Sequence, residues 1–182
     1  MTRVRTSGFT LIELLVVMSV IALLSSLMLA SITEAREKAY NAKVKQEVHQ
    51  YVIALQMAKD EYGQFPDPTE APDAGSLNVD YCLGDDYPSD SCGYNGSAYR
   101  ENGSVNGPLE EYISGLPSDT TQVRSGGFYY TGYLYRCERK TNGKCNQIQL
   151  TWTLKGENKE CGRHGTPISG VSNATYCSGD IE

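Results

Sequence analysis

The longest hydrophobic pattern in the chain lies near its start. The apolar stretch that begins at Phe9 carries a single charge, at Glu13, and residues 14–32 carry none. These nineteen uncharged residues come close to the roughly 20 that a helix needs to cross a bilayer. The pattern therefore predicts a membrane-spanning helix over residues 9–32.

The helical pattern continues beyond this stretch, but with only one apolar face. From Thr33 onward the composition turns polar, and apolar residues recur at every third or fourth position. They are Val44, Val48, Tyr51, Leu55, Ala58 and Tyr62. No proline interrupts the helix, and Gly63 with Pro66 is a typical helix end. We expect an amphipathic half-helix over residues 33–63 that packs against a globular domain. The alternative, a coiled-coil stalk, would need a longer apolar stripe.

Alternation with a period of two residues lies in the last third of the chain. Residues 148–154 alternate apolar and polar side chains, which predicts a half-buried strand. The aromatic segment at residues 128–135 is its expected partner, with a bulge at Gly132. Between the two segments, Asn142-Gly143 is a strong signal for a tight turn. An antiparallel hairpin is therefore predicted.

The rest of the globular domain, which spans residues 64–182, has weaker patterns. Residues 67–106 are rich in Gly, Pro, Asp, Ser and Asn and predict a long structured loop. Residues 108–115 predict a short helix, and residues 160–182 an irregular tail. The predicted fold class is α+β, a long N-terminal helix that carries a small antiparallel sheet of about three or four strands with disulfide-closed loops.

The charges that precede the apolar helix indicate its orientation. Arg3 and Arg5 precede it without any acid, which keeps the N-terminus cytoplasmic and places everything after the helix outside. An ordinary secretory signal peptide fits poorly, because the apolar stretch is longer than usual and no small-x-small cleavage site follows it.

All six cysteines lie after residue 80, on the exported side of this helix. An even number in an oxidising compartment predicts three disulfides. Six cysteines allow fifteen pairings, and local spacing favours Cys82–Cys92, Cys137–Cys145 and Cys161–Cys177. A zinc site is the alternative, but the chain has no C-x-x-C pair and the compartment is oxidising.

Composition and motifs exclude several classes of protein. A chain of 182 residues fits one globular domain plus the helix. Its formal net charge of −6 argues against bulk nucleic-acid binding. No nucleophile elbow, phosphate loop or metalloprotease helix is present, and a lone histidine such as His49 or His164 is more often structural than catalytic. We therefore predict neither an enzymatic activity nor a cofactor.

Glu13 is costly at the edge of an apolar helix and needs a partner. No Lys or Arg lies within two helical turns of it. The surrounding segment GFTLIEL at residues 8–14, after a short basic leader, resembles the prepilin signature of the type IV pilin superfamily. That superfamily includes the pseudopilins of type II secretion and competence systems, and the resemblance covers roughly residues 1–65.

The resemblance implies a processing pathway. Residues 1–8 would be a leader that a prepilin peptidase removes between Gly8 and Phe9, and Phe9 would then be N-methylated. On assembly, Glu13 would form a salt bridge with the Phe9 amine of a neighbouring subunit. The implied partners are the prepilin peptidase, an inner-membrane assembly platform, the membrane before assembly, and other pilins in a helical filament.

The implied function is that of a structural subunit of a type IV pilus-like filament, which is extracellular once assembled. The disulfide-rich domain favours this interpretation. A pseudopilin of a type II secretion or competence system, in a periplasmic filament, is the alternative. A monomeric membrane-anchored adhesin is a further one, but it would make no use of Gly8, Phe9 and Glu13.

An acidic cluster surrounds the first two cysteines. It consists of Asp80, Asp85, Asp86 and Asp90. Carboxylates at short spacing can hold Ca²⁺, but no EF-hand spacing is present. A solvated acidic loop is the favoured interpretation, and we predict no metal site.

A basic cluster flanks the predicted hairpin tip. It consists of Arg136, Arg139, Lys140 and Lys144 against one acid, Glu138. A disulfide across the loop would hold these side chains in place for an anionic partner. The candidate partners are DNA phosphates, an acidic cell-surface polymer, or an acidic face of the next subunit. The simpler interpretation is a solubilising tip that blunts the hairpin.

Overall fold

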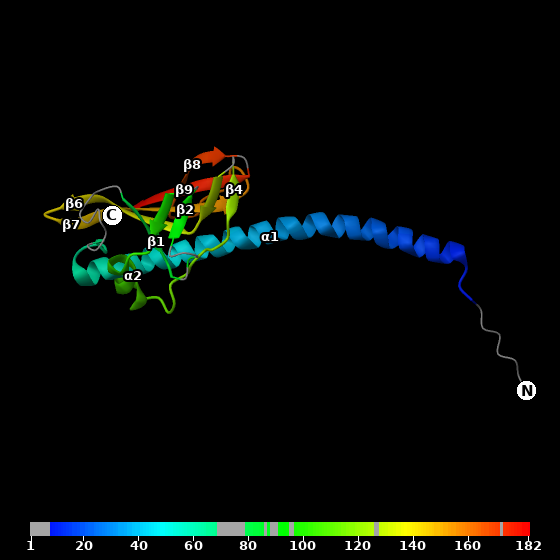
Figure 1. Cartoon of the computed structure of the whole chain (residues 1–182), viewed down its shortest axis with the longest axis horizontal. Coiled ribbons are helices and arrows are strands. Elements are labelled where there is room, and N and C mark those ends of the chain that lie inside the picture. Colours follow the sequence, from blue (N-terminus) through cyan, green and yellow to red (C-terminus); the bar gives the residue numbers. More distant parts are fainter. Residues whose placement is uncertain are drawn as a thin grey trace, which may run out of the picture. The chain divides into compact units, whose positions relative to one another are not determined.

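The computed structural model describes residues 8–68, 79–85, 87, 91–94, 97–125, 128–171 and 173–182. The chain divides into two compact units, Met1–Ala39 and Tyr40–Glu182. We call the second unit the head. Its secondary structure is shown in Figure 1, and each unit is described by itself.

The helix α1 runs without interruption from Leu11 to Tyr62, a length of 52 residues. This confirms the long helix expected from the continuous helical pattern and the absence of proline. Gly63 follows with a φ of 68°, a left-handed conformation that glycine adopts without a steric penalty. The predicted helix end is therefore also present.

The larger sheet of the described residues has five strands in the spatial order β1-β6-β7-β9-β8, and all neighbours run antiparallel. Their bounds are Asp80–Leu83 for β1, Tyr133–Thr141 for β6, Lys144–Lys155 for β7, Thr166–Val171 for β8 and Ala174–Ile181 for β9. The smaller sheet has the order β3-β2-β5-β4. Its strands are β2 (Ser91–Tyr94), β3 (Ser97–Arg100), β4 (Val123–Ser125) and β5 (Phe128–Thr131).

The predicted α+β class, a long helix followed by an antiparallel β domain, is confirmed, but the strand count was too low. The tail at residues 160–182 is not irregular, because it forms β8 and β9, and β9 pairs with β7 over eight residues. The predicted loop at residues 67–106 contains β1, β2 and β3. The short helix α2 spans Gly103–Glu110 instead of residues 108–115, with Asn102 as its N-cap.

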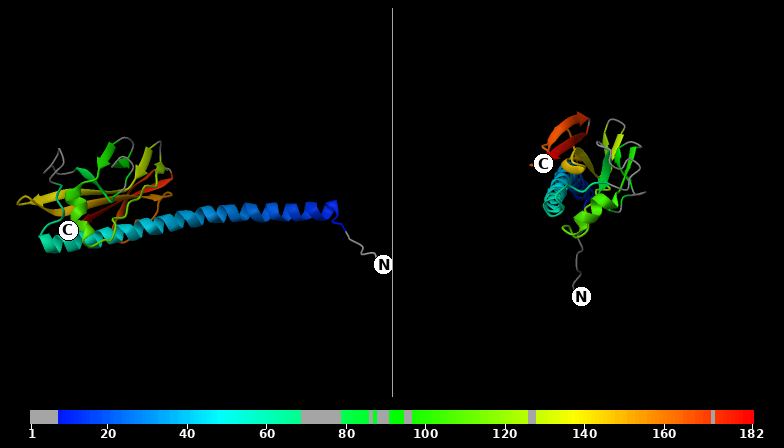
Figure 2. Two further views of the ribbon diagram at one scale, coloured as in Figure 1. Left: turned by 60° about the horizontal axis from the view of Figure 1, so that its bottom comes forward. Right: turned by 90° about the vertical axis from the view of Figure 1, so that its left-hand side faces the viewer.

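The core of the head lies between α1 and the five-stranded sheet (Figure 2). Five residues of the predicted helical stripe are at most 3% exposed: Val44, Val48, Tyr51, Leu55 and Ala58. Tyr62 was expected to join them, but it is 48% exposed. The opposing face of β7 is formed by the predicted alternating residues Ile148, Leu150, Trp152 and Leu154, all at most 3% exposed. Packing of these two faces holds residues 40–62 of α1 on the sheet.

Tyrosine hydroxyl groups add specific contacts to this apolar packing. Tyr51 donates to the carbonyl of Pro117 at 2.5 Å, and Tyr40 donates to a carboxylate oxygen of Asp119 at 2.5 Å. Burial raises the pKa of both hydroxyls, so they remain protonated donors. Each hydroxyl ties α1 to the segment between α2 and β4.

The predicted hairpin is present, but the bulge predicted at Gly132 is not. Asn142 and Gly143 join β6 to β7 with φ values of 54° and 79°, as a type I′ turn requires. Gly132 is not a bulge within one strand, because the chain leaves the smaller sheet after β5 and enters the larger sheet at β6. A Cβ at Gly132 would lie 2.8 Å from atoms of Tyr87 and Cys92, so this crossing requires glycine.

A second close approach involves Gly179 in β9. A Cβ there would lie 1.8 Å from the carbonyl oxygen of His164. We expect Gly179→Ala to lower the free energy of unfolding by about 1–3 kcal/mol, as overpacking does, measured by denaturant unfolding of the full chain in detergent. In the control Gly107→Ala, the added Cβ has open space within α2. That variant should stay close to the parent chain in stability, because the helix propensity that alanine gains is offset by the steric restriction from the following Pro108. Equal stability of Gly179→Ala and the parent chain would contradict the close packing.

Candidate functional site

The start of α1 is closed by a capping box between Thr10 and Glu13. One carboxylate oxygen of Glu13, Oε2, accepts hydrogen bonds from the Thr10 amide at 3.0 Å and from the Thr10 hydroxyl at 2.8 Å. The Glu13 amide in turn donates to the Thr10 hydroxyl oxygen at 3.3 Å. This reciprocal pair satisfies two of the amide groups that a helix start leaves without partners. The Thr-x-x-Glu pattern at residues 10–13 is the sequence signal from which this capping box could have been predicted.

The capping box does not neutralise the charge of Glu13. Its hydrogen bonds all come from the uncharged Thr10 and use one of the two carboxylate oxygens. Within the described residues, no Lys or Arg forms an ion pair with Glu13. The second oxygen can therefore accept hydrogen bonds from a cation of another molecule.

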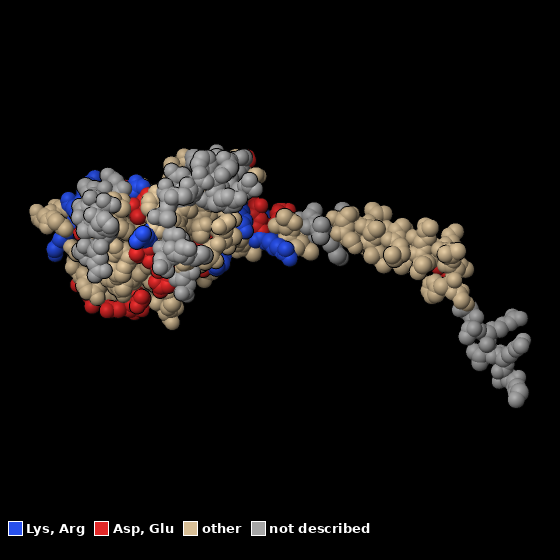
Figure 3. Space-filling model, viewed as in Figure 1, with Lys and Arg blue, Asp and Glu red and all other residues tan. Residues whose placement is uncertain are grey.

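The residues that follow present an apolar surface on all sides. Phe9 is 84% exposed, and the side chains from Leu11 to Ser26 are all exposed. By length and composition, α1 is long and apolar enough to cross a membrane. Figure 3 shows its first part almost without charged side chains. A surface of this kind requires lipid or another protein to cover it.

The polar groups in this segment are compatible with lipid. Ser19 donates to the carbonyl of Val16 at 2.7 Å, and Ser26 donates to the carbonyl of Leu23 at 2.8 Å. Both hydroxyls are thus satisfied within the helix, which avoids the cost of an unpaired donor in hydrocarbon.

The comparison with protein families agrees with this arrangement. Residues 3–29 match the family model of the prokaryotic N-terminal methylation motif, the prepilin-type signal of type IV pilins and pseudopilins. None of the curated proteins or solved structures in the comparison matches this chain. The motif indicates a type IV pilin-like or pseudopilin protein with a structural role, and it fits a membrane-anchored precursor that joins a filament with other pilins after processing by a prepilin peptidase.

In the head, the six cysteines form the three expected disulfides. They are Cys82–Cys92, Cys137–Cys145 and Cys161–Cys177, with Cα–Cα distances of 5.7, 6.0 and 5.6 Å. The zinc alternative is therefore excluded, because these sulfur atoms are bonded to one another.

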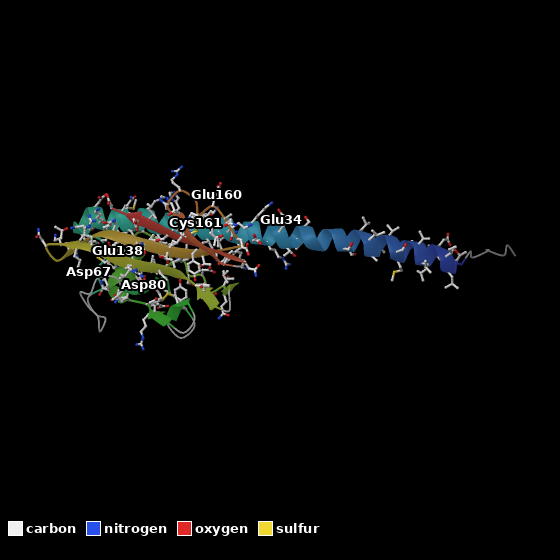
Figure 4. All side chains as sticks on the ribbon, turned by 90° about the horizontal axis from the view of Figure 1, so that it is seen from above. Glu34, Asp67, Asp80, Glu138, Glu160 and Cys161 are labelled. Atoms are coloured by element: carbon white, nitrogen blue, oxygen red, sulfur yellow. A yellow bond between two sulfur atoms is a disulfide. The ribbon has the colours of Figure 1, made fainter. Side chains whose placement is uncertain are left out.

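The basic cluster at the hairpin tip is partly neutralised. Arg136 contacts the Asp80 carboxylate through Nε and Nη2, each at 2.7 Å, and this raises the pKa of its guanidinium. Lys140 lies 2.8 Å from an oxygen of Asp67. Figure 4 labels both acids near this end of the sheet. Glu138 is therefore not the only acid near these four cations, because Asp67 and Asp80 also contact them. Among the described residues, only Arg139 and Lys144 of this cluster lack an ion pair.

The acidic cluster does not assemble within the described part of the chain. Asp80 is engaged by Arg136, while Asp86 and Asp90 lie outside the described residues. Among the residues that the structure describes, no group of three His, Cys, Asp or Glu side chains is placed to hold a metal ion.

Proposed function

We propose that this chain is the structural subunit of a type IV pilus-like filament. Its precursor is a single-pass membrane protein with the N-terminus in the cytoplasm and the head outside, as Arg3 and Arg5 favour. A prepilin peptidase removes residues 1–8, Phe9 is methylated, and an assembly platform in the inner membrane transfers the subunit into the filament.

The observation that carries this proposal is the combination found at the start of α1. A helix segment that is apolar on every side carries one carboxylate, Glu13, whose only described partner is an uncharged threonine. In a filament core, the apolar surfaces of several subunits would cover one another. The new amine of Phe9 from a neighbouring subunit would supply the missing cation for Glu13.

A pseudopilin of a type II secretion or competence system is the second candidate, because the same N-terminal motif serves both kinds of filament. The three disulfides in a head of 143 residues favour the pilus, since they stabilise a domain that faces the extracellular medium. Imaging of purified filaments, with identification of their subunits by mass spectrometry, separates the two candidates.

Processing at Gly8 is the first test. We expect intact-mass spectrometry of the exported protein to find a chain that begins at singly methylated Phe9. Gly8→Val should retain the leader, because the added side chain would obstruct the peptidase. The substitution itself is tolerated by the fold, since nothing lies within 4 Å of a Cβ at Gly8. Ser7→Ala is the matched control and should be cut normally. A mature N-terminus at Met1, or beyond Ile32, would contradict the proposal.

A further inference from the structure

The only two histidines of the chain meet on the surface of the head. Nδ1 of His49, on α1, lies 2.8 Å from Nε2 of His164, in the loop between β7 and β8. The ring centroids are 5.0 Å apart and the ring planes differ by 16°. This centroid distance is close to the sum of the nitrogen–nitrogen distance and two ring radii. The two nitrogens therefore point directly at one another in nearly coplanar rings.

This geometry restricts the charge of the pair. One nitrogen must donate and the other must accept, so the contact exists when the pair carries no added proton or one. With one added proton it becomes a charge-assisted hydrogen bond, which is the stronger form. With two added protons both nitrogens are donors, and the contact is lost.

A metal ion fits this arrangement poorly. Zinc holds imidazole nitrogens at about 2.0–2.1 Å, and the 2.8 Å gap between two facing nitrogens leaves no room for it without movement of the loop. The charged residues among the described lining of the surrounding pocket, Lys45 and Arg163, are also positive.

These cations share a pocket with the histidine pair. The pocket has a volume of about 370 Å³ and is lined by Lys45, Gln46, His49, Gly162, Arg163 and His164, among other residues. Lys45 lies against Gly162, with its Cδ 3.5 Å from the position of an added Cβ. No carboxylate is among the described lining residues. Within the described residues, neither Lys45 nor Arg163 forms an ion pair.

The charge of this pocket is unusual for the protein. The chain has a formal net charge of −6, whereas the charged residues among the described lining of this pocket, Lys45 and Arg163, are both positive. Burial, together with the neighbouring His49 and Arg163, lowers the pKa of His164. An anion in the pocket would offset these repulsions.

We propose that this pocket binds a phosphate-class oxyanion through Lys45, Arg163 and the histidine pair, and that the pair takes up one proton from solvent as the anion binds. Such an anion brings up to two negative charges and several acceptor oxygens, which match two fixed cations and one protonated imidazole. All four side chains belong to the head, so the inference does not depend on filament assembly.

The test uses the imidazole C–H signals in proton NMR spectra of the full chain in detergent. His49→Gln and His164→Gln assign the two signals. We compare pH titrations in sodium phosphate and in sodium chloride at equal ionic strength. In phosphate, the pKa of His164 should rise by about 1, as expected for an adjacent opposite charge. Glycerol phosphate is a second probe, and its binding would show that the pocket also admits a phosphate group attached to a larger molecule.

A charge-matched pair of variants tests the location. Arg163→Gln should weaken phosphate binding about tenfold, the loss expected for one charge-assisted hydrogen bond. Arg139→Gln removes the same charge at the hairpin tip and should leave phosphate binding unchanged. Coincident titrations in phosphate and chloride would overturn the proposal. Equal weakening by both variants would also overturn it, because the effect would then come from overall charge.

Discussion

We expect the replacement of Glu13 with alanine to block or weaken filament assembly and to leave the precursor in the membrane. Membrane insertion depends on the apolar residues, and removal of a carboxylate from their edge makes insertion easier. Under the proposed salt bridge, assembly should instead depend on the charge, because the Phe9 amine of the neighbouring subunit would be buried without a partner, at a cost of about 3–5 kcal/mol per subunit. The yield of sheared filaments, measured beside the amount of chain in the membrane fraction, checks this expectation.

The capping box offers a competing explanation that two further variants separate. Thr10→Ala removes the partner of Glu13 within the helix but keeps the carboxylate. It should cost about 1 kcal/mol at the helix start and still allow filaments. Glu13→Gln keeps a side chain that suits a capping box but lacks the charge, and it should fail like Glu13→Ala. If Thr10→Ala abolishes filaments while Glu13→Gln preserves them, capping explains the requirement and the intersubunit salt bridge is contradicted.

Features encoded by neighbouring residues could be predicted from the sequence. The length of α1 follows from unbroken helical spacing, and its end follows from Gly63 and Pro66. The turn at Asn142-Gly143 follows from two residues that tolerate positive φ. The disulfides followed from spacing for the same reason, since each joins cysteines at most 16 positions apart.

Features that depend on distant partners could not be predicted. Strand β9 has a weak pattern of its own, and its pairing with β7 and the burial of Cys177 and Ile181 decide its conformation. The acids that contact Arg136 and Lys140 were not counted with the basic cluster, because they lie 56 and 73 positions away. His49 and His164 each looked solitary, since 115 positions separate them. In all these cases the tertiary fold supplies the neighbour.

Removal of the Cys161–Cys177 disulfide should destabilise the head more than removal of either other disulfide. Cys161 lies in the loop between β7 and β8, and Cys177 lies in β9, so the bond joins this loop to the sheet. Both residues are buried, which favours alanine as the replacement. For a separation of 16 residues, the chain-entropy model gives about 3 kcal/mol. We expect the double variant Cys161→Ala/Cys177→Ala to lower Tm by on the order of 10 °C.

The hairpin disulfide Cys137–Cys145 is the matched comparison. Its separation of 8 residues corresponds to about 2.5 kcal/mol in the same model, and the type I′ turn at Asn142-Gly143 already holds the two strands together. The double variant Cys137→Ala/Cys145→Ala should therefore lose less stability. Thermal unfolding of the full chain in detergent, followed by circular dichroism, ranks the two variants. Because the parent chain should contain no free thiols, a thiol assay before unfolding confirms its starting state. A larger loss for the hairpin variant would contradict the loop-entropy argument and would show that the tip, rather than the loop before β8, limits the stability of the head.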